Sequence, residues 1–245
     1  MTSEWGTTKK HIPVLQEDVL SYLAVKPDGI YLDGTLGLGG HASAVQKQLS
    51  PKGQLVGFDG DEEAVRHCEK MLSPSCHLVQ APYDTFPQHL SSLSIQAVDG
   101  MLLDLGMSSY QLDTPARGFA YRTEGPLDMR FDKNGPTTAR HIINSWPVSE
   151  LKKLFKEIGE ERRASAIATA IAKVRGSNPV DTTSDLTHII KSVVGDHAAT
   201  KTLSRIFQAL RMVVNGELAC LEKFLNTFAG YLKTGGRVVI ISYLS

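Results

Sequence analysis

Short apolar runs alternate with helical patterns over roughly the first hundred residues of the chain. The runs are typical of buried strands, and we predict strands at residues 29–33, 54–59, 76–80 and 98–106. Apolar positions with helical spacing follow the first two runs, at residues 40–49 and 61–72. This alternation predicts an α/β fold with a parallel sheet covered by helices on both faces.

The pattern changes after residue 106. Residues 113–136 are rich in Gly, Pro and charge and show no clear period. Helical stripes follow, with Ser149 as a candidate N-cap, at residues 149–158, 164–171 and 186–193. Further helical positions precede the turn residues "KTGG" and a fifth strand, "RVVIIS". We predict a helical insertion over residues 113–200 that interrupts an α/β domain made of residues 1–112 and 201–245.

Composition adds one asymmetry to an ordinary chain. The 26 basic and 26 acidic residues of the whole sequence balance. Residues 113–205 hold 15 basic and 11 acidic residues, a net charge of +4, so the remainder carries −4. A basic segment of this size indicates a part that meets a polyanion, although ordinary surface variation gives the same count.

Cysteine usage and hydropathy indicate where the protein acts. Cys68, Cys76 and Cys220 have no paired spacing, which predicts a reducing compartment, no disulfide framework and no bound metal. No apolar run reaches the roughly 18 residues of a membrane helix. Residues 1–14 contain neither a signal-peptide core nor an arginine-rich leader. We therefore expect a cytoplasmic protein that does not contact a membrane.

The stretch "YLDGTLGLGGH" carries the strongest chemical signal, because four glycines crowd the turn between a strand and a helix. Glycines at such a turn let a ligand approach the backbone, and the helix N-terminus offers free N–H groups. The spacing lacks the third glycine of the dinucleotide-binding motif G-x-G-x-x-G, which disfavours a nicotinamide oxidoreductase. No G-K-[ST] follows the glycines, which excludes a phosphate-binding P-loop. The spacing is closest to the D-x-G-x-G-x-G turn of class I methyltransferases, with Thr35 in the first glycine's place.

Two later residues fit a nucleoside cofactor. Asp59 ends the second strand about 20 residues after the glycines, where an acid accepts hydrogen bonds from ribose hydroxyls. Alternatively, an acid at the end of a strand only caps the next helix, and Asp61 could be that cap here. Tyr83 follows the third strand, where it either packs on an adenine face or is a half-buried core tyrosine. We predict S-adenosylmethionine as the cofactor.

The stretch "DLGMSSYQLDTPARGFAYRTEGPLDMRFD" closely resembles the RsmH (MraW) family of small-subunit ribosomal RNA cytosine-N4 methyltransferases. The resemblance extends over most of the chain, through "HIPVL", "DGTLGLGGH", "GEERRASAIATAI", "TKTLSRIFQALRMVVNGEL" and "GGRVVIIS". It implies a Rossmann-like methyltransferase domain interrupted by a helical domain that faces the substrate. It also implies methyl transfer to the exocyclic N4 of a cytidine in the decoding region, on free rRNA or on the assembled small subunit.

The resemblance also implies roles for particular residues. Cofactor contacts fall on Gly39, Gly40, His41, Asp59, Tyr83, Asp104 and Gln111. Asp104, at the end of the fourth strand, is the candidate catalytic residue, because it can accept a hydrogen bond from the amine as positive charge develops. Ser108 and Ser109 are further candidates for that role. Six arginines are candidates for contact with RNA phosphates, and a solvated helix face or an internal salt bridge is the alternative for each. They are Arg117, Arg130, Arg140, Arg162, Arg163 and Arg211.

The chain departs from the family pattern at its end. Family members continue past the fifth strand with S-F-H-S-L-E-D-R, whereas this chain reads "ISYLS", so the C-terminal strands of the fold are expected to be missing. An open fifth strand favours aggregation or pairing into a homodimer. The alternative to an active enzyme is therefore a catalytically impaired homologue that binds cofactor or RNA without turnover.

Overall fold

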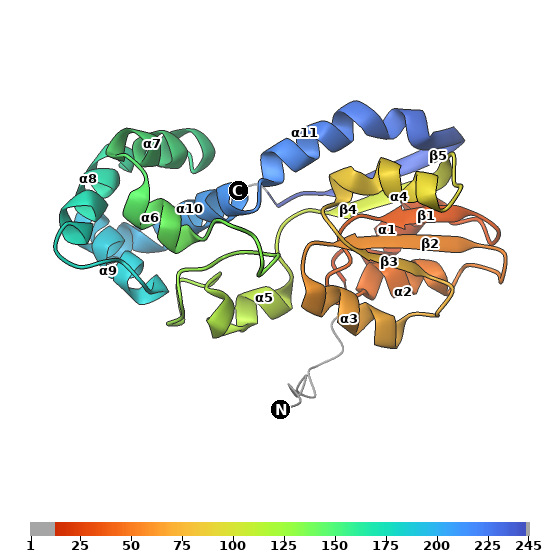
Figure 1. Cartoon of the computed structure of the whole chain (residues 1–245), viewed down its shortest axis with the longest axis horizontal. Coiled ribbons are helices and arrows are strands. Elements are labelled where there is room, and N and C mark those ends of the chain that lie inside the picture. The colour runs from red at the N-terminus through yellow and green to blue at the C-terminus, as the bar shows by residue number, and fades with distance from the viewer. Residues whose placement is uncertain (1–12, 244–245) are drawn as a thin grey trace. The chain divides into compact units, whose positions relative to one another are not determined.

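A computed structural model describes residues 13–243, so His11 and Ile12 of "HIPVL" and the predicted lack of a leader lie outside the described residues. The chain divides into two compact units (Figure 1). The first comprises Met1–Gly106 with Cys220–Ser245, and the second comprises Met107–Ala219.

The first unit contains a five-stranded parallel sheet in the order β3-β2-β1-β4-β5. Its strands are β1 (Ile30–Asp33), β2 (Gln54–Asp59), β3 (His77–Gln80), β4 (Val98–Asp104) and β5 (Leu232–Ile241). The first four confirm the sequence prediction to within two residues. This order is that of a Rossmann-like fold, in which ligands bind beyond the carboxyl ends of the strands.

The fifth strand begins earlier than the sequence predicts. Lys233–Gly236 was expected to be a turn before the strand, but β5 already pairs with β4 at Leu232, opposite Val98. The register then shifts, so that Gly100 faces Arg237, and the four residues form an irregularity inside the strand rather than a turn. Gly235, at φ +78°, supplies a backbone conformation that few other residues adopt.

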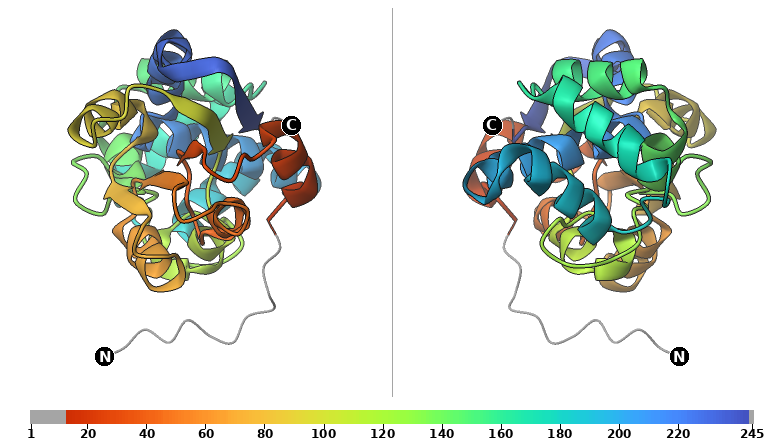
Figure 2. Two further views of the ribbon diagram at one scale, coloured as in Figure 1. Left: turned by 90° about the vertical axis from the view of Figure 1, so that its right-hand side faces the viewer. Right: turned by 90° about the vertical axis from the view of Figure 1, so that its left-hand side faces the viewer.

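Helices cover both faces of this sheet (Figure 2, left). On one face, α1 (Gln16–Leu23), α2 (Gly40–Gln46) and α3 (Glu62–Met71) pack their apolar residues against the strands. On the other face lie the short η1 (Tyr83–Thr85) and η4 (Phe228–Tyr231), with α4 (Phe86–Ser92) and the later part of α11 (Glu217–Thr227). The unit thus has the Rossmann-like architecture that the resemblance implied.

The second unit is helical and has its own apolar core (Figure 2, right). Its elements are α5 (Ser109–Asp113), η2 (Pro115–Arg117), α6 (Ala139–Ser145), α7 (Val148–Lys153), η3 (Leu154–Ile158), α8 (Ala164–Arg175), α9 (Thr183–Val194) and α10 (Asp196–Val214). Among these, η3 is a π-helical turn that continues α7. Pro147, not the predicted Ser149, is the N-cap of α7.

This unit is wider than the insertion that we predicted over residues 113–200. It includes α5 and all of α10, because Leu203, Ile206 and Phe207 of α10 pack into the helical core rather than onto the sheet. Periodicity shows that such a helix buries one face. It does not show whether that face packs into the helical core or against the sheet.

Candidate functional site

The glycine turn is hydrogen-bonded to the two strands that flank β1. Gly34 donates its N–H to the carbonyl of Leu102 in β4, and Leu36 donates to the carbonyl of Phe58 in β2. Gly39 is at φ +74°, and a Cβ there would lie 2.9 Å from the Sγ of Cys68. The turn therefore needs glycine at this position for both its conformation and its packing.

Asp59 organises the same turn from the end of β2. Its Oδ2 accepts a hydrogen bond from the N–H of Gly37 at 2.8 Å, and its Oδ1 accepts one from the N–H of Asp61 at 2.8 Å. Burial raises the pKa of Asp59 to about 6, against the lowering effect of these two hydrogen bonds. A carboxylate has about four acceptor positions, so two remain for ligand hydroxyls. Asp61 itself is the N-cap of α3.

Three further polar side chains meet at the carboxyl ends of β1 and β4 and the first turn of α2. Asp33 is 2% exposed, His41 is 7% exposed, and the Nε2 of His41 lies 3.7 Å from the Oδ2 of Asp104. Thr35 links the two acids, because its N–H donates to the Oδ1 of Asp33 and its Oγ1 accepts the N–H of Asp104 at 2.6 Å.

This cluster contains buried atoms without hydrogen-bond partners in the described part of the chain. They are Asp33 Oδ2, both ring nitrogens of His41, and Asp104 Oδ1. Burial raises the pKa of Asp33 to about 6, while the N–H of Thr35 and then His41 lower it and Asp104 raises it. Unpaired buried polar atoms are costly, so they indicate a place that a polar ligand completes. Among residues 13–243 no group of three or more His, Cys, Asp or Glu side chains could hold a metal.

Tyr83, the predicted adenine neighbour, begins η1. Its ring meets the ring of Phe224 edge-on, with centroids 5.7 Å apart, and a Cβ on Gly34 would lie 2.9 Å from its Cβ. The tyrosine is half-buried against the first residue of the glycine turn. Its contact with adenine stays a prediction.

Gln111, the last predicted cofactor contact, belongs to the second unit. Its Oε1 accepts the N–H of Ser108, and its own N–H donates to Ser108 Oγ, which forms a capping box at α5. This gives Ser108 the capping role that serines often have after a strand. The structure gives Gln111 a local role, and its cofactor contact stays a prediction.

Three of the arginines predicted to contact RNA, Arg117, Arg130 and Arg211, bind groups of the chain itself. Arg117 is 4% exposed and donates from Nη2 to the carbonyls of Arg130 and Phe131. Arg130 forms a two-point pair with Asp128, at 2.8 and 2.7 Å. Arg211 forms a similar pair with Glu217, at 2.7 and 3.0 Å. We correct the expectation for Arg117, because a guanidinium buried to this extent cannot reach a phosphate.

Sequence reasoning missed two residues of the cluster. Asp33 was part of the quoted turn but was not selected, and Thr35 was noted only as a replacement for glycine. The available signal for Asp33 was an acid at the end of an apolar run, the same signal that selected Asp59 and Asp104. The role of Thr35 depends on a contact with Asp104, 69 residues away, which no local pattern encodes.

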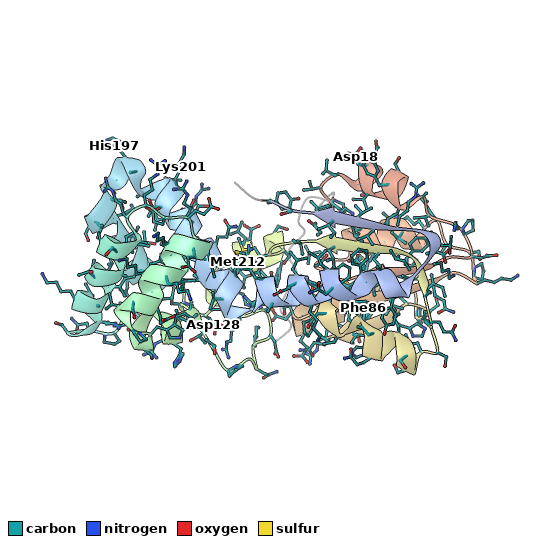
Figure 3. The ribbon with its side chains drawn as sticks, turned by 90° about the horizontal axis from the view of Figure 1, so that it is seen from above. Asp18, Phe86, Asp128, His197, Lys201 and Met212 are labelled. Atoms are coloured by element: carbon teal, nitrogen blue, oxygen red, sulfur yellow. The ribbon has the colours of Figure 1, made fainter. Side chains whose placement is uncertain are left out.

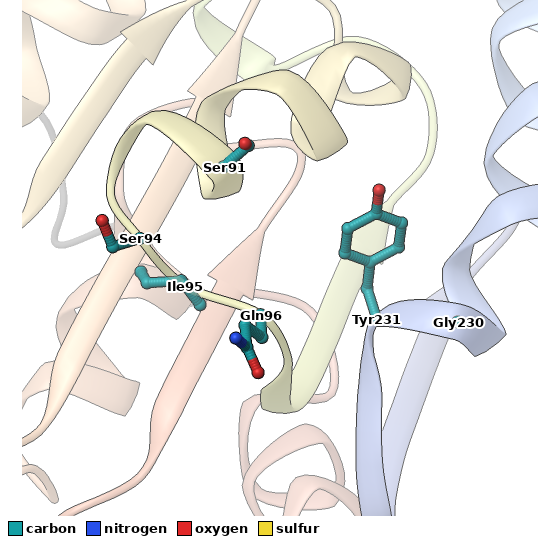
Figure 4. Close-up of a pocket in the computed structure, with 6 residues that line it drawn as sticks. All are labelled: Ser91, Ser94, Ile95, Gln96, Gly230 and Tyr231. Carbon is teal, nitrogen blue, oxygen red and sulfur yellow. The ribbon is translucent and has the colours of Figure 1, made fainter.

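An open pocket of about 530 Å³ lies elsewhere in the first unit (Figure 4). It is lined by Ser91, Ser94, Ile95, Gln96, Gly230 and Tyr231. These residues precede β4 and β5 and so lie at the amino ends of the strands, whereas Asp33 and Asp104 lie at the carboxyl ends. The pocket contains none of the predicted site residues.

Comparison with known proteins finds relatives that share one name. The chain is 46% identical to the ribosomal RNA small subunit methyltransferase H of Halothermothrix orenii, over 96% of this chain and 78% of that protein. It is 43% identical to the protein of the same name from Caldicellulosiruptor saccharolyticus, again over 96% and 78%. Similarity to solved structures is low: a SAM-dependent methyltransferase from Aquifex aeolicus aligns at 16% identity with a TM-score of 0.31, over 58% of this chain and 77% of that one.

A family model supplies the last comparison. The model described as the MraW methylase family matches residues 8–245. This range includes all of the second unit, the first unit from residue 8 onward, and every predicted site residue. The chain belongs to the MraW methylase family.

Proposed function

We propose that this protein is an S-adenosylmethionine-dependent methyltransferase that acts on small-subunit ribosomal RNA at the exocyclic N4 of a cytidine in the decoding region. The observation that carries the proposal is the cluster of unpaired polar atoms on Asp33, His41 and Asp104 beside the glycine turn. The relatives named small subunit methyltransferase H support the same RNA substrate. The cytidine and its N4 come from the resemblance and from the chemistry below.

The residues around the turn fit this cofactor. S-Adenosylmethionine carries a ribose, an adenine and a cationic methionine end. Asp59 would accept hydrogen bonds from the ribose hydroxyls, and Tyr83 would pack beside the adenine. Gly39, Gly40 and His41 would border the methionine end, where the carboxylates of Asp33 and Asp104 favour positive charge.

The bound cofactor supplies an electrophilic methyl group on a sulfonium. A cytidine amine that takes this methyl group would have to pass one proton to an acceptor of the protein or to water. Asp104 is suited to this step, because its Oδ1 has no hydrogen-bond partner among residues 13–243 and can accept a hydrogen bond from the amine as charge develops. The N–H of Asp104, bound by Thr35, fixes the end of the strand that carries it.

The state of the cysteines favours nitrogen as the attacking atom. Methylation of a cytosine ring carbon commonly needs a thiolate that first attacks the ring. Burial raises the pKa of both Cys68 and Cys220 to about 12 and also raises that of Cys76. All three thiols are therefore neutral near pH 7. Such thiols are poor nucleophiles.

Methyl transfer to small ribosomal subunits that lack the modification tests this proposal. The protein is incubated with labelled S-adenosylmethionine and such subunits, or with the free rRNA, and the modified nucleoside is identified by mass. We expect N4-methylcytidine. Binding of the cofactor without transfer, while a full-length family member is active alongside, would instead support the catalytically impaired homologue.

A further inference from the structure

Glu161 is a buried carboxylate of the second unit that the proposed cofactor chemistry does not use. It lies between η3 and α8 and is 4% exposed. Its Oε1 accepts the N–H of Arg163 at 2.9 Å, which stabilises the start of α8. Its Oε2 is also buried and has no hydrogen-bond partner in the described part of the chain.

The ion-pair partner of this oxygen is Arg205 of α10. The Nη1 of Arg205 lies 3.8 Å from Glu161 Oε2, and the arginine side chain is 40% exposed. Removing a carboxylate from water is costly unless a cation compensates it, so Glu161 favours this position of the guanidinium. A guanidinium has five N–H donors, and a side chain this exposed keeps donors for a second anion.

The backbone around this pair is closely packed. A Cβ on Gly159 would lie 3.3 Å from the carbonyl oxygen of Arg205 and 2.8 Å from that of Phe155. Glu160 follows at φ +49°, a strained value for a residue other than glycine. Strain of this kind and π-helical turns both concentrate at functional sites. The backbone of Arg205 is therefore fixed by packing, and Glu161 attracts its guanidinium across 3.8 Å without a hydrogen bond.

Two further basic residues are close to this pair: one is adjacent to Glu161 in the sequence, and the other lies one helical turn from Arg205. Arg162 follows Glu161 and is exposed, and Lys201, marked on α10 in Figure 3, is exposed one turn before Arg205. Neither forms an ion pair with any residue that the structure describes. The acid next to them, Glu160, is also exposed and offsets only one of these charges.

We infer that Arg205 binds a phosphate of the RNA substrate and that Glu161 is the residue that positions it. A planar guanidinium pairs with a phosphate through two parallel hydrogen bonds, and a guanidinium that a buried carboxylate already attracts to one position loses less freedom when it does so. Arg162 and Lys201 add attraction for the same backbone. The inference rests on the proposed function in taking small-subunit rRNA as the substrate.

Binding of unmethylated small-subunit rRNA, measured against salt concentration, tests this role. Arg205→Ala should weaken binding about tenfold and make the slope of log affinity against log salt shallower by about one. It should raise KM for the RNA and leave kcat and the affinity for S-adenosylmethionine unchanged. Arg205→Lys keeps the charge but not the fork, and it should restore the salt slope and only part of the affinity.

The variant Glu161→Gln tests the positioning role, because the amide oxygen can still accept the N–H of Arg163 but the neutral side chain no longer attracts Arg205. It should weaken RNA binding about threefold. The double variant Glu161→Gln with Arg205→Ala leaves no unpaired buried carboxylate and should bind RNA as Arg205→Ala alone does. The matched control is Arg66→Ala, which removes an exposed, ion-paired arginine from the first unit and should change binding less than twofold.

Each outcome decides one part of the account. Equal RNA binding by wild type and Arg205→Ala would overturn the inference, and additive effects in the double variant would overturn the role of Glu161. If wild type binds RNA but transfers no methyl group, the proposed function fails while a loss of binding in Arg205→Ala still supports the inference. A wild-type chain that does not bind the RNA overturns both.

Discussion

In the first unit, Asp33, His41 and Asp104 present buried atoms that have no hydrogen-bond partner among the described residues, whereas in the second unit Arg117 and Arg130 are bound by carbonyls and carboxylates of the chain. The difference follows from where these residues lie. Residues at the ends of parallel strands point beyond the last backbone hydrogen bond, where a ligand completes them. Arginines in a long loop segment instead compensate the backbone groups that have no helix or sheet partner.

The largest effect that we expect concerns Arg117. Replacing it with Met removes the donor that binds the partly buried carbonyls of Arg130 and Phe131. We expect the free energy of unfolding to fall by about 2–4 kcal/mol, measured by urea denaturation. The control Arg122→Met removes an exposed arginine from the same segment and should stay within about 0.5 kcal/mol of wild type. Equal stability of Arg117→Met and wild type would show that Arg117 does not stabilise the fold.

Asp59 gives the next largest effect, on binding rather than on folding. Asp59→Ala removes a charged acceptor, and we expect binding of S-adenosylmethionine to weaken by about 1.5–3 kcal/mol, measured by calorimetry. Asp59→Asn keeps the shape of the side chain but loses the charge and one acceptor, so its affinity for the cofactor should lie between those of wild type and Asp59→Ala. Unchanged affinity in Asp59→Ala would sink the assignment of Asp59 to the ribose.

Asp33 sharpens the comparison through pH. Its pKa is about 6 in the folded chain, raised by burial from the ordinary value of 3.8. The folded state therefore holds the proton more tightly, and this contribution to stability is complete below pH 3.8 and is lost as the pH rises through about 6. Asp33→Asn does not undergo this loss. Without ligand, its free energy of unfolding should therefore exceed that of wild type by about 1–3 kcal/mol at pH 8.

The measurement for Asp33 is the urea midpoint at pH 4 and pH 8, with no ligand present. Wild type and Asp33→Asn should differ more at the higher pH. Asp18→Asn, in the first turn of α1, is the control, because that acid stays exposed. A difference between Asp33→Asn and wild type that does not change with pH would show that the Asp33 carboxyl stays ionised throughout.

Much of the first unit could be predicted from the sequence, because local signals and tertiary structure agree there. Four strands, the glycine turn and the acid Asp59 each follow from spacing within one strand–helix unit. The second unit was harder, since Arg117 and Asn215 act across long separations: Asn215 accepts the N–H of Phe131 and donates to the carbonyl of Met129. An arginine in a charged motif looks the same whether it binds a phosphate or a carbonyl.

The smallest effect concerns Arg211. Arg211→Lys keeps the charge but loses the two-point pair with Glu217, and we expect the free energy of unfolding to fall by about 0.5–1 kcal/mol. Affinity for small-subunit rRNA, measured by filter binding, should stay within about twofold of wild type. A tenfold loss of RNA affinity without a loss of stability would restore Arg211 as an RNA contact.

The imidazole of His41 reports most directly on the central claim, that the unpaired groups of the first unit bind the cofactor. Its nitrogen signals can be followed by NMR while S-adenosylmethionine is added, with His41→Gln used for their assignment. We predict that they shift and saturate at one equivalent, along the binding curve that calorimetry gives. Tight binding of the cofactor with no change in the His41 signals would contradict the account, because the cofactor would then occupy another site.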